Sequence, residues 1–289
     1  IASCLVGSEM CIRDSAYSLA QLTVLSLGPP EIVAVAAQAG YSHAGIRLLP
    51  AAPGGTAYPL MNDAAQLRET LAVLRDTGVQ VFDLEIIRLG ERFEAGDYRA
   101  FFEVGQQLGA KAVLVGCDDP DPARLAQSYA ALCEAARPYG LTADVEFMPW
   151  TAVRNAADAV AVVEAAGRPA NAGILVDGIH FGRSHTTLDE IRALPREWLH
   201  YAQMCDAVAG TDFSDAELIH TARCERLLPG EGTVDLKGLF EALPADLPVS
   251  VEIPHDVRAP QLGALEWARQ TLAATRQRLE GDGARCPAP

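Results

Sequence analysis

Four oxygen-bearing side chains in the second half of the chain each lie at the end of an apolar run. Glu146 follows LTADV, Asp177 follows AGILV, Gln203 lies in LHYAQM and Glu252 follows LPVSV. Oxygen donors without thiolates are typical ligands of hard divalent cations such as Mg²⁺ or Mn²⁺. One acid at the end of a strand is more often a helix cap or a surface charge, but four on consecutive runs favour a shared metal site.

The elements that would position these side chains alternate regularly. Strand-like apolar runs span residues 18–26, 44–49, 79–87, 111–116, 141–147, 172–177, 199–204 and 248–253. Helical patterns separate them at residues 30–40, 63–78, 97–108, 122–139, 155–166, 187–194, 235–243 and 260–279. The acidic stretch at residues 208–221 reads as irregular. Eight strands alternating with about eight helices predict an α/β fold of the (β/α)8 TIM barrel type, in which strand ends carry the chemistry.

The competing topology is a doubly wound open sheet. That fold usually has a glycine-rich phosphate turn after its first strand, and the segment SLGPPE offers one glycine there. The barrel is therefore preferred. We expect residues 1–15, which show no apolar period, to be a non-native or disordered extension, and residues 16–289 to form a single barrel domain.

Composition limits the class of partner. The 289 residues carry a formal charge of −15, which argues against a nucleic-acid partner because the acidic surface would repel phosphates. The seven cysteines form no CxxC pair, no apolar run is long enough to span a bilayer, and no secretory signal is recognised. We expect a cytoplasmic protein with a small-molecule substrate and no membrane partner. Whether it forms a homo-oligomer stays open.

A metal site of this kind supports a definite class of reaction. A metal that chelates a carbonyl and its neighbouring hydroxyl acidifies the α C–H and stabilises an enediolate. Carboxylates on both sides of the substrate can remove and return the proton if their pKa values differ. We predict a divalent-metal-dependent isomerase or epimerase acting on a sugar or sugar-like hydroxy-ketone. The alternatives are a dehydratase, in which the same enolate expels a β-hydroxyl, and a non-catalytic barrel, which the complete set of oxygen donors disfavours.

Several motifs resemble one known family. The segments VEFMPW, LVDGIHF, YAQMCDA, RLLPGEGTVDL and VSVEIP are similar to those of the sugar phosphate isomerase/epimerase superfamily, the xylose isomerase-like TIM barrels. That resemblance implies a divalent metal held by Glu146, Asp177, Gln203 and Glu252, with Mn²⁺ or Mg²⁺ expected and Co²⁺ or Zn²⁺ as alternatives. Within the family, Q-x-x-D-A followed by R-x-x-P-G-E-G-x-x-D-L resembles bacterial 3-dehydroshikimate dehydratases and related uncharacterised proteins of the isomerase-epimerase branch. A dehydratase of the 3-dehydroshikimate or inosose type is therefore the main alternative.

The resemblance also implies roles for individual residues. Glu146 and Glu252 would be the acid and base. His180, in a D-x-x-H pattern that relatives share, would contact the substrate or protonate a leaving hydroxyl, unless it is an exposed loop histidine. Arg226, with Arg223 as the neighbouring candidate, would present a guanidinium to a substrate carboxylate or phosphate. The alternative for either arginine is a surface charge or a partner for Glu225.

Two further residues are candidates for substrate binding. Arg47, near the end of the second strand, would bind a substrate anion or form a salt bridge at the rim of the barrel. Glu85, on the third strand, would accept hydrogen bonds from substrate hydroxyls or orient an arginine. The endonuclease branch of the superfamily is disfavoured, because its zinc cluster is rich in histidine and only His180 of the six histidines lies in a matching position.

Overall fold

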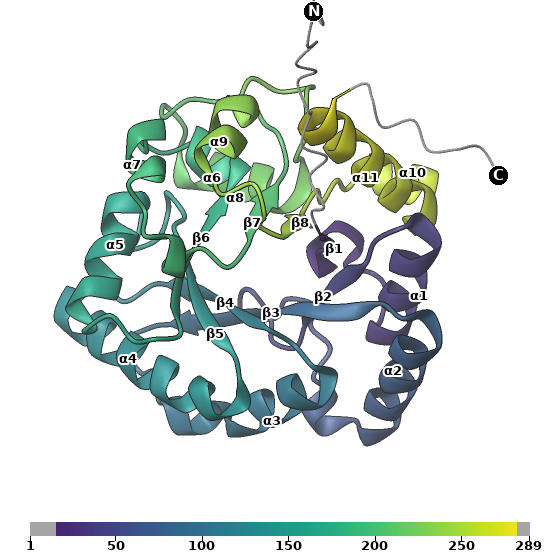
Figure 1. The fold of residues 1–289 in the computed structure, drawn as a ribbon, viewed down its shortest axis with the longest axis horizontal. Helices are drawn as coiled ribbons and strands as arrows, with labels where there is room; N and C mark the ends of the chain where they lie inside the picture. The colour runs from purple at the N-terminus through teal and green to yellow at the C-terminus, as the bar shows by residue number, and fades with distance from the viewer. Residues whose placement is uncertain (1–15, 282–289) are drawn as a thin grey trace, which may run out of the picture.

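The computed structural model describes residues 16–281, and in them eight parallel strands close into a barrel in the order β1 to β8. Figure 1 shows the helices as an outer ring around these strands. The strands are β1 (Tyr17–Leu19), β2 (His43–Arg47), β3 (Gln80–Leu89), β4 (Ala112–Cys117), β5 (Thr142–Glu146), β6 (Ala172–Asp177), β7 (Ala202–Met204) and β8 (Val249–Val251). The predicted TIM barrel is confirmed. The predicted extension at residues 1–15 lies outside the described residues.

The helices begin and end at the residue types that favour helix ends. They are α1 (Pro29–Ala39), α2 (Ala64–Thr77), α3 (Arg99–Leu108), α4 (Pro122–Ala136), α5 (Ala156–Ala165), α6 (Gly178–Gly182), α7 (Leu188–Arg192), α8 (Asp215–Cys224), α9 (Leu236–Ala242), α10 (Arg258–Leu262) and α11 (Ala264–Glu280). Asp63 caps α2 by accepting hydrogen bonds from the backbone N–H groups of Ala65 and Gln66. Gly78, in the left-handed conformation at φ +76°, ends the same helix.

Three predicted elements differ from the structure. The first strand stops at Leu19, and residues 21–24 form a 3₁₀ helix, η1 (Gln21–Val24), which the Thr23 hydroxyl ties to the barrel by donating to Val251 O at 2.8 Å. The stretch at 208–221 is not irregular throughout, because its second half forms the start of α8. The long last helix is two helices, separated at Gly263 with φ +80°.

The sequence did contain a signal for α8. Ser214 and Glu217 form a capping box, in which Ser214 N donates to Glu217 Oε2 at 2.8 Å and Glu217 N donates to Ser214 Oγ at 3.4 Å. The S-x-x-E spacing predicts such a helix start. The prediction missed it because the acidic residues hid a weak apolar period.

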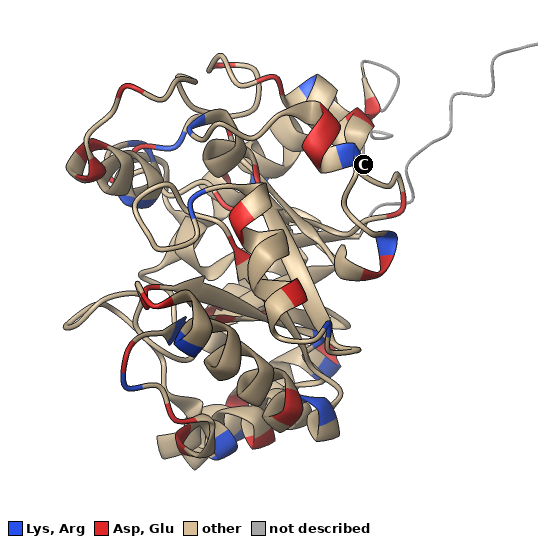
Figure 2. Ribbon diagram, turned by 90° about the vertical axis from the view of Figure 1, so that its left-hand side faces the viewer, with Lys and Arg blue, Asp and Glu red and all other residues tan. Residues whose placement is uncertain are grey.

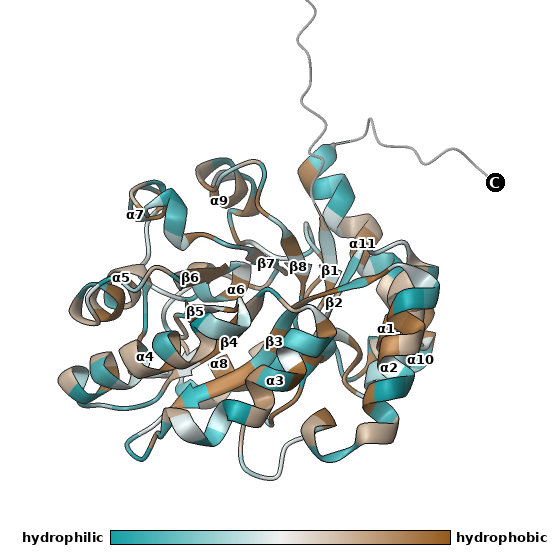
Figure 3. Ribbon diagram, turned by 60° about the horizontal axis from the view of Figure 1, so that its bottom comes forward, coloured by the Kyte–Doolittle hydropathy of each residue, from teal (hydrophilic) through white to brown (hydrophobic). Residues whose placement is uncertain are grey.

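The core lies between the strands and the ring of helices. Large side chains with less than 2% exposure come from several helices, among them Tyr129, Phe101, Phe102 and Trp267. Figure 3 shows helices of the ring, such as α1, carrying both hydrophobic and hydrophilic residues, as expected of helices with one buried face. In Figure 2 acidic and basic residues are interspersed over the outer elements. Within residues 16–281, no helix is both long and apolar enough to cross a membrane.

Candidate active site and metal centre

The four predicted metal ligands converge at the carboxyl end of the barrel. Glu146 ends β5, Asp177 ends β6, Gln203 lies in β7 and Glu252 follows β8, and each is at most 4% exposed. The side-chain amide of Gln203 lies between two of the carboxylates. In the orientation that satisfies hydrogen bonding, its Nε2 donates to Glu146 Oε1 at 2.9 Å and to Asp177 Oδ2 at 3.0 Å. Three strands thus deliver polar atoms to one point.

His180 adds an imidazole to this group. It lies in the short helix α6, whose first turn is capped by Asp177 through a 2.7 Å hydrogen bond from Ile179 N. His180 Nε2 is 3.5 Å from Glu146 Oε1, and Nδ1 has no partner among the described residues. The ring is 2% exposed and meets Trp150 edge-on at 5.0 Å, so the exposed-loop alternative is wrong. Burial lowers the pKa of His180 to about 4, which makes the ring neutral near pH 7.

Arg226 reaches the site from a long excursion after β7. The chain returns beside the strand end through backbone hydrogen bonds that Asp206 and Leu227 exchange, at 3.0 and 2.9 Å. Arg226 Nη1 then lies 2.6 Å from Asp177 Oδ2, and Nη2 lies 2.7 Å from Glu252 Oε2. Arg226 is 2% exposed, so it is not a surface charge.

The suggested partner of Arg226 is engaged elsewhere. Glu225 lies 3.2 Å from His220 Nε2, on the outside of the excursion. The guanidinium of Arg226 is instead the bridge between two predicted metal ligands.

The three carboxylates have different proton affinities. Burial, together with Glu252 and Asp177, raises the pKa of Glu146 well above its usual range. Burial also raises the pKa of Glu252, to about 7, although Arg226 opposes the rise. Burial acts in the same direction on Asp177, but Arg226 and His180 outweigh it and hold that pKa below its ordinary value. Glu252 can therefore exchange a proton near neutral pH, Glu146 has a raised pKa, and Asp177 stays ionised.

The donor set fits a divalent cation. Ligand atoms of Glu146, Asp177 and His180 all lie within 4.8 Å of one another. A half-turn of the Gln203 amide would present its oxygen, in place of its nitrogen, to the same two carboxylates. With the three carboxylates ionised, they and the Arg226 guanidinium sum to a formal charge of −2, which one divalent ion neutralises. The oxygens suit Mg²⁺ or Mn²⁺, and the imidazole widens the range to Zn²⁺.

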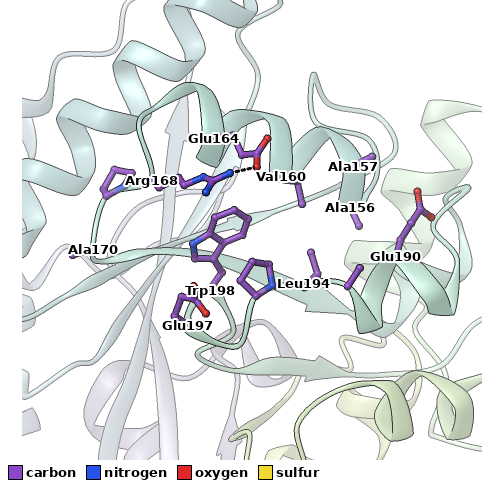
Figure 4. Close-up of a pocket in the computed structure, with 13 residues that line it drawn as sticks. Ala156, Ala157, Val160, Glu164, Arg168, Ala170, Glu190, Leu194, Glu197 and Trp198 are labelled. Carbon is purple, nitrogen blue, oxygen red and sulfur yellow. Dashed lines mark hydrogen bonds and ion pairs between the residues drawn. The ribbon is translucent and has the colours of Figure 1, made fainter.

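A cavity of ≈ 320 Å³ lies over this group. Its lining includes Glu146, His180, Arg226 and Glu252 together with Arg47, Arg88, Arg223, Leu114, Met148 and Trp150. A larger cavity of ≈ 520 Å³ lies outside the barrel, between α5 and the segment that contains η5 (Arg196–Trp198) (Figure 4). Figure 4 shows an ion pair of Glu164 and Arg168 there, at 2.6 Å, but none of the converging ligands. The smaller cavity is therefore the candidate active site.

Arg47 and Glu85 form a buried ion pair beside the cavity. Arg47 Nε donates to Glu85 Oε2 at 2.7 Å, and the other Glu85 oxygen accepts a hydrogen bond from Gln21 N at 3.0 Å. The structure shows the salt bridge that was the alternative role for Arg47. Glu85 orients an arginine, as one of its two predicted roles required. Arg47 also lines the cavity, whereas Glu85 lies behind it.

Sequence reasoning missed two neighbours of the site. Arg88 was left out because the third strand was predicted to end at residue 87, whereas β3 continues to Leu89. Cys205 lies with Sγ 3.4 Å from Asp177 Oδ1 and 3.3 Å from Arg226 Nη1. Its position directly after Met204, the last residue of the predicted strand LHYAQM, was the available signal.

Three solved structures illustrate what the chain is similar to. The IolI protein with a bound zinc atom has a TM-score of 0.75 at 19% identity, covering 91% of this chain and 98% of that chain. D-allulose 3-epimerase from Methylomonas sp., in complex with D-allulose, has a TM-score of 0.65 at 18% identity, covering 91% and 97%. AsbF from Bacillus anthracis, described as a probable 3-DHS dehydratase, has a TM-score of 0.69 at 13% identity, covering 90% and 98%.

At these identities the structural similarities show the fold and leave the reaction open. No curated protein matches the sequence significantly. The family model described as the xylose isomerase-like TIM barrel matches residues 33–278, which is most of the chain. The chain therefore belongs to the xylose isomerase-like TIM barrel family.

Proposed function

We propose that the protein is a divalent-metal-dependent isomerase or epimerase that acts on a sugar or sugar-like hydroxy-ketone. One observation carries the proposal. Glu146, Asp177, Gln203 and His180 bring polar atoms together at the carboxyl end of the barrel, under a cavity of monosaccharide size. Active sites of TIM barrels lie at this end. The family has members that are isomerases, epimerases and dehydratases, and this site has the groups that such reactions need.

In the proposed reaction Glu146 and Glu252 transfer the proton. Both line the cavity, and burial raises the pKa of each, to about 7 for Glu252, which can therefore hold or release a proton near neutral pH. The carboxyl that starts ionised removes the proton α to the carbonyl, and the other returns a proton to the opposite face. A divalent ion held by these carboxylates would supply Lewis-acid polarisation of the carbonyl.

The other residues hold this pair in place. Asp177, Gln203 and the two glutamates are the proposed metal ligands, with Mn²⁺ or Mg²⁺ preferred. Arg226 fixes the carboxylates of Asp177 and Glu252 through its two terminal nitrogens. In our proposal its remaining hydrogen-bonding capacity, and that of Arg47, faces the substrate. Trp150 and Met148 close the apolar side of the cavity.

A specific observation also favours the dehydratase alternative. His180 is buried, 3.5 Å from Glu146, and its Nδ1 has no partner among residues 16–281. An imidazole with a free ring nitrogen can hydrogen-bond a β-hydroxyl and, once the ring has taken up a proton, can protonate that hydroxyl as it leaves. The first step, removal of the α proton, is the same for both reactions.

Deuterium exchange separates the two reactions. We would follow ketoses, sugar acids, inososes and 3-dehydroshikimate by NMR in D₂O with added Mn²⁺ or Mg²⁺. The proposal expects metal-dependent exchange at the α carbon, which Glu252→Gln reduces by about 10²- to 10⁴-fold. Return of deuterium to carbon indicates an isomerase or epimerase, and an alkene product indicates a dehydratase. Exchange that proceeds equally in Glu252→Gln would contradict the assignment of the base.

A further inference from the structure

The cavity wall beside the metal ligands is rich in arginine. Arg47, Arg88, Arg223 and Arg226 all line it. Three of these guanidiniums have carboxylate partners: Arg226 bridges Asp177 and Glu252, Arg47 pairs with Glu85, and Arg88 donates from Nε to Asp118 Oδ2 at 2.6 Å. Those three positive charges are neutralised within the protein.

Arg223 differs from the other three. It lies in the last turn of α8 and is partly buried, yet within residues 16–281 it makes no hydrogen bond or ion pair. Burial lowers the pKa of Arg223, and the positive charges of Arg88 and Arg47 lower it further. The three cations therefore lie close enough to repel one another. The carboxyl end of α8 offsets only a fraction of a charge. The Asp118 carboxylate also favours the charged form of Arg223, but it is already paired with Arg88, so within residues 16–281 Arg223 has no ion-pair partner of its own.

We propose that Arg223 binds an anionic group of the substrate, a carboxylate or a phosphate. The inference rests on the proposed function, because it names the substrate class of the same site. A guanidinium binds either anion through two parallel hydrogen bonds. The ligand would be a hydroxy-ketone with its reacting carbons against Glu146 and Glu252 and its anionic end against Arg223.

The position of Arg223 explains how the two halves of such a ligand fit one cavity. Arg226 contacts the carboxylates and lies three residues along the chain from Arg223, and both line the same space. A volume of ≈ 320 Å³ is at the small end of the range of about 300–1,000 Å³ for ligand sites. That size suits a single sugar or sugar acid, with its charged end a few ångströms from its reacting carbons.

The test is calorimetric binding of three matched hydroxy-ketones to the full chain with Mn²⁺: D-fructose, D-fructose 6-phosphate and 5-keto-D-gluconate. We expect at least one of the two anions to bind about tenfold or more tightly than D-fructose. This difference in affinity should shrink as the NaCl concentration is raised. Arg223→Gln should weaken the binding of that anion by about 10- to 100-fold and leave the affinity for D-fructose unchanged. Arg223→Lys should weaken it less. The preferred anion distinguishes a phosphate from a carboxylate.

Arg75→Gln is the matched control, because Arg75 lies on the exposed surface of α2 and should not affect binding. Thermal melting establishes that each variant is folded, and Arg223→Lys replaces Arg223→Gln if the latter melts early. The inference is overturned if neither anion binds more tightly than D-fructose, or if the Arg223 variants keep the preference. If the same variants still catalyse metal-dependent deuterium exchange with neutral substrates, the proposed function holds even though the inference about Arg223 fails.

Discussion

The barrel interior holds two layers of polar side chains that differ in organisation. The upper layer is defined here as Glu85, Glu146, Gln203 and Glu252, together with Asp177. The lower layer consists of the side chains two residues earlier on four of the same strands: Asp83, Asp144, Tyr201 and Ser250. Because side chains alternate along a strand, both sets point into the barrel. Both are buried.

The lower layer does not converge. Asp144 is engaged sideways, accepting from Thr142 Oγ1 at 2.6 Å and pairing with His200 Nδ1 at 2.6 Å. Asp83 Oδ1 and Oδ2, the Tyr201 hydroxyl and the Ser250 hydroxyl have no hydrogen-bond partner among the described residues. Burial raises the pKa of Asp83, and Glu85 and other nearby carboxylates raise it further.

The difference between the two layers shows which features turn a set of buried acids into a site. The upper layer receives a cation, Arg226, from the loop after β7, and its Gln203 amide lies within 3.0 Å of two carboxylates. The lower layer receives His200 at its edge and no arginine. Acidic residues on barrel strands are therefore not enough. A site requires convergence and a source of positive charge, and only the upper layer opens into a cavity.

Removing the cation of the upper layer should have the largest effect on stability. Arg226→Met leaves Asp177 and Glu252 buried without their partner, and loss of one member of a buried ion pair costs about 3–5 kcal/mol. We expect that loss in urea unfolding without metal, with part of it recovered on adding Mn²⁺. Arg223→Met, which breaks no ion pair, should change the free energy of unfolding by at most about 0.5 kcal/mol. Equal losses in the free energy of unfolding for Arg226→Met and Arg223→Met would contradict the distinction between a paired and an unpaired arginine.

The lower layer can be disturbed from a neighbouring strand. A Cβ on Gly173 would lie 2.0 Å from Asp144 Oδ1 and 2.5 Å from His200 Nδ1. Gly173→Ala must displace that pair, at a cost of about 1–3 kcal/mol. Gly90→Ala is the matched control because a Cβ there meets nothing within 4 Å. A Gly173→Ala protein as stable as the control would mean that the Asp144–His200 contact is dispensable.

The same pair gives a small dependence of stability on pH. Burial alone lowers the pKa of His200, but the hydrogen bond and charge of Asp144 outweigh it, so the folded pKa is raised above 6.5. The stabilisation, about 1 kcal/mol for a partly exposed pair, is therefore fully present below pH 6.5 and is lost as pH rises through the raised value. Urea unfolding of the wild type and His200→Gln should differ more at pH 5.5 than at pH 9. A constant difference would argue against the pair.

The sequence allowed the barrel and the convergence of four polar side chains at the strand ends to be predicted, because both depend on period and order along the chain. Each of Glu146, Asp177 and Glu252 follows an apolar run whose length fixes where the strand ends. The partner of a side chain does not follow from such patterns. Arg226 reaches Asp177, 49 residues away in sequence, only because the excursion returns through the Asp206–Leu227 bridge.

Loop structure was the part that sequence reasoning predicted worst. The segment before Ala222 carries the capping box that starts α8, and that helix places Arg223 on the cavity wall. Without the helix, Arg223 was one candidate beside Arg226 with no basis for separating their roles. In the structure Arg226 pairs with two carboxylates, whereas Arg223 pairs with none among residues 16–281, and this difference is a property of three-dimensional contacts.

The most direct test of the account is a calorimetric titration of Mn²⁺ into the wild type, Asp177→Asn and Asp83→Asn. These two substitutions make the same chemical change in the upper and the lower parts of the barrel interior. We predict one Mn²⁺ per wild-type chain, affinity reduced by at least about tenfold in Asp177→Asn, and wild-type affinity in Asp83→Asn. Absence of Mn²⁺ binding to the wild type, or equal weakening by both substitutions, would contradict the assignment of the metal to the upper layer.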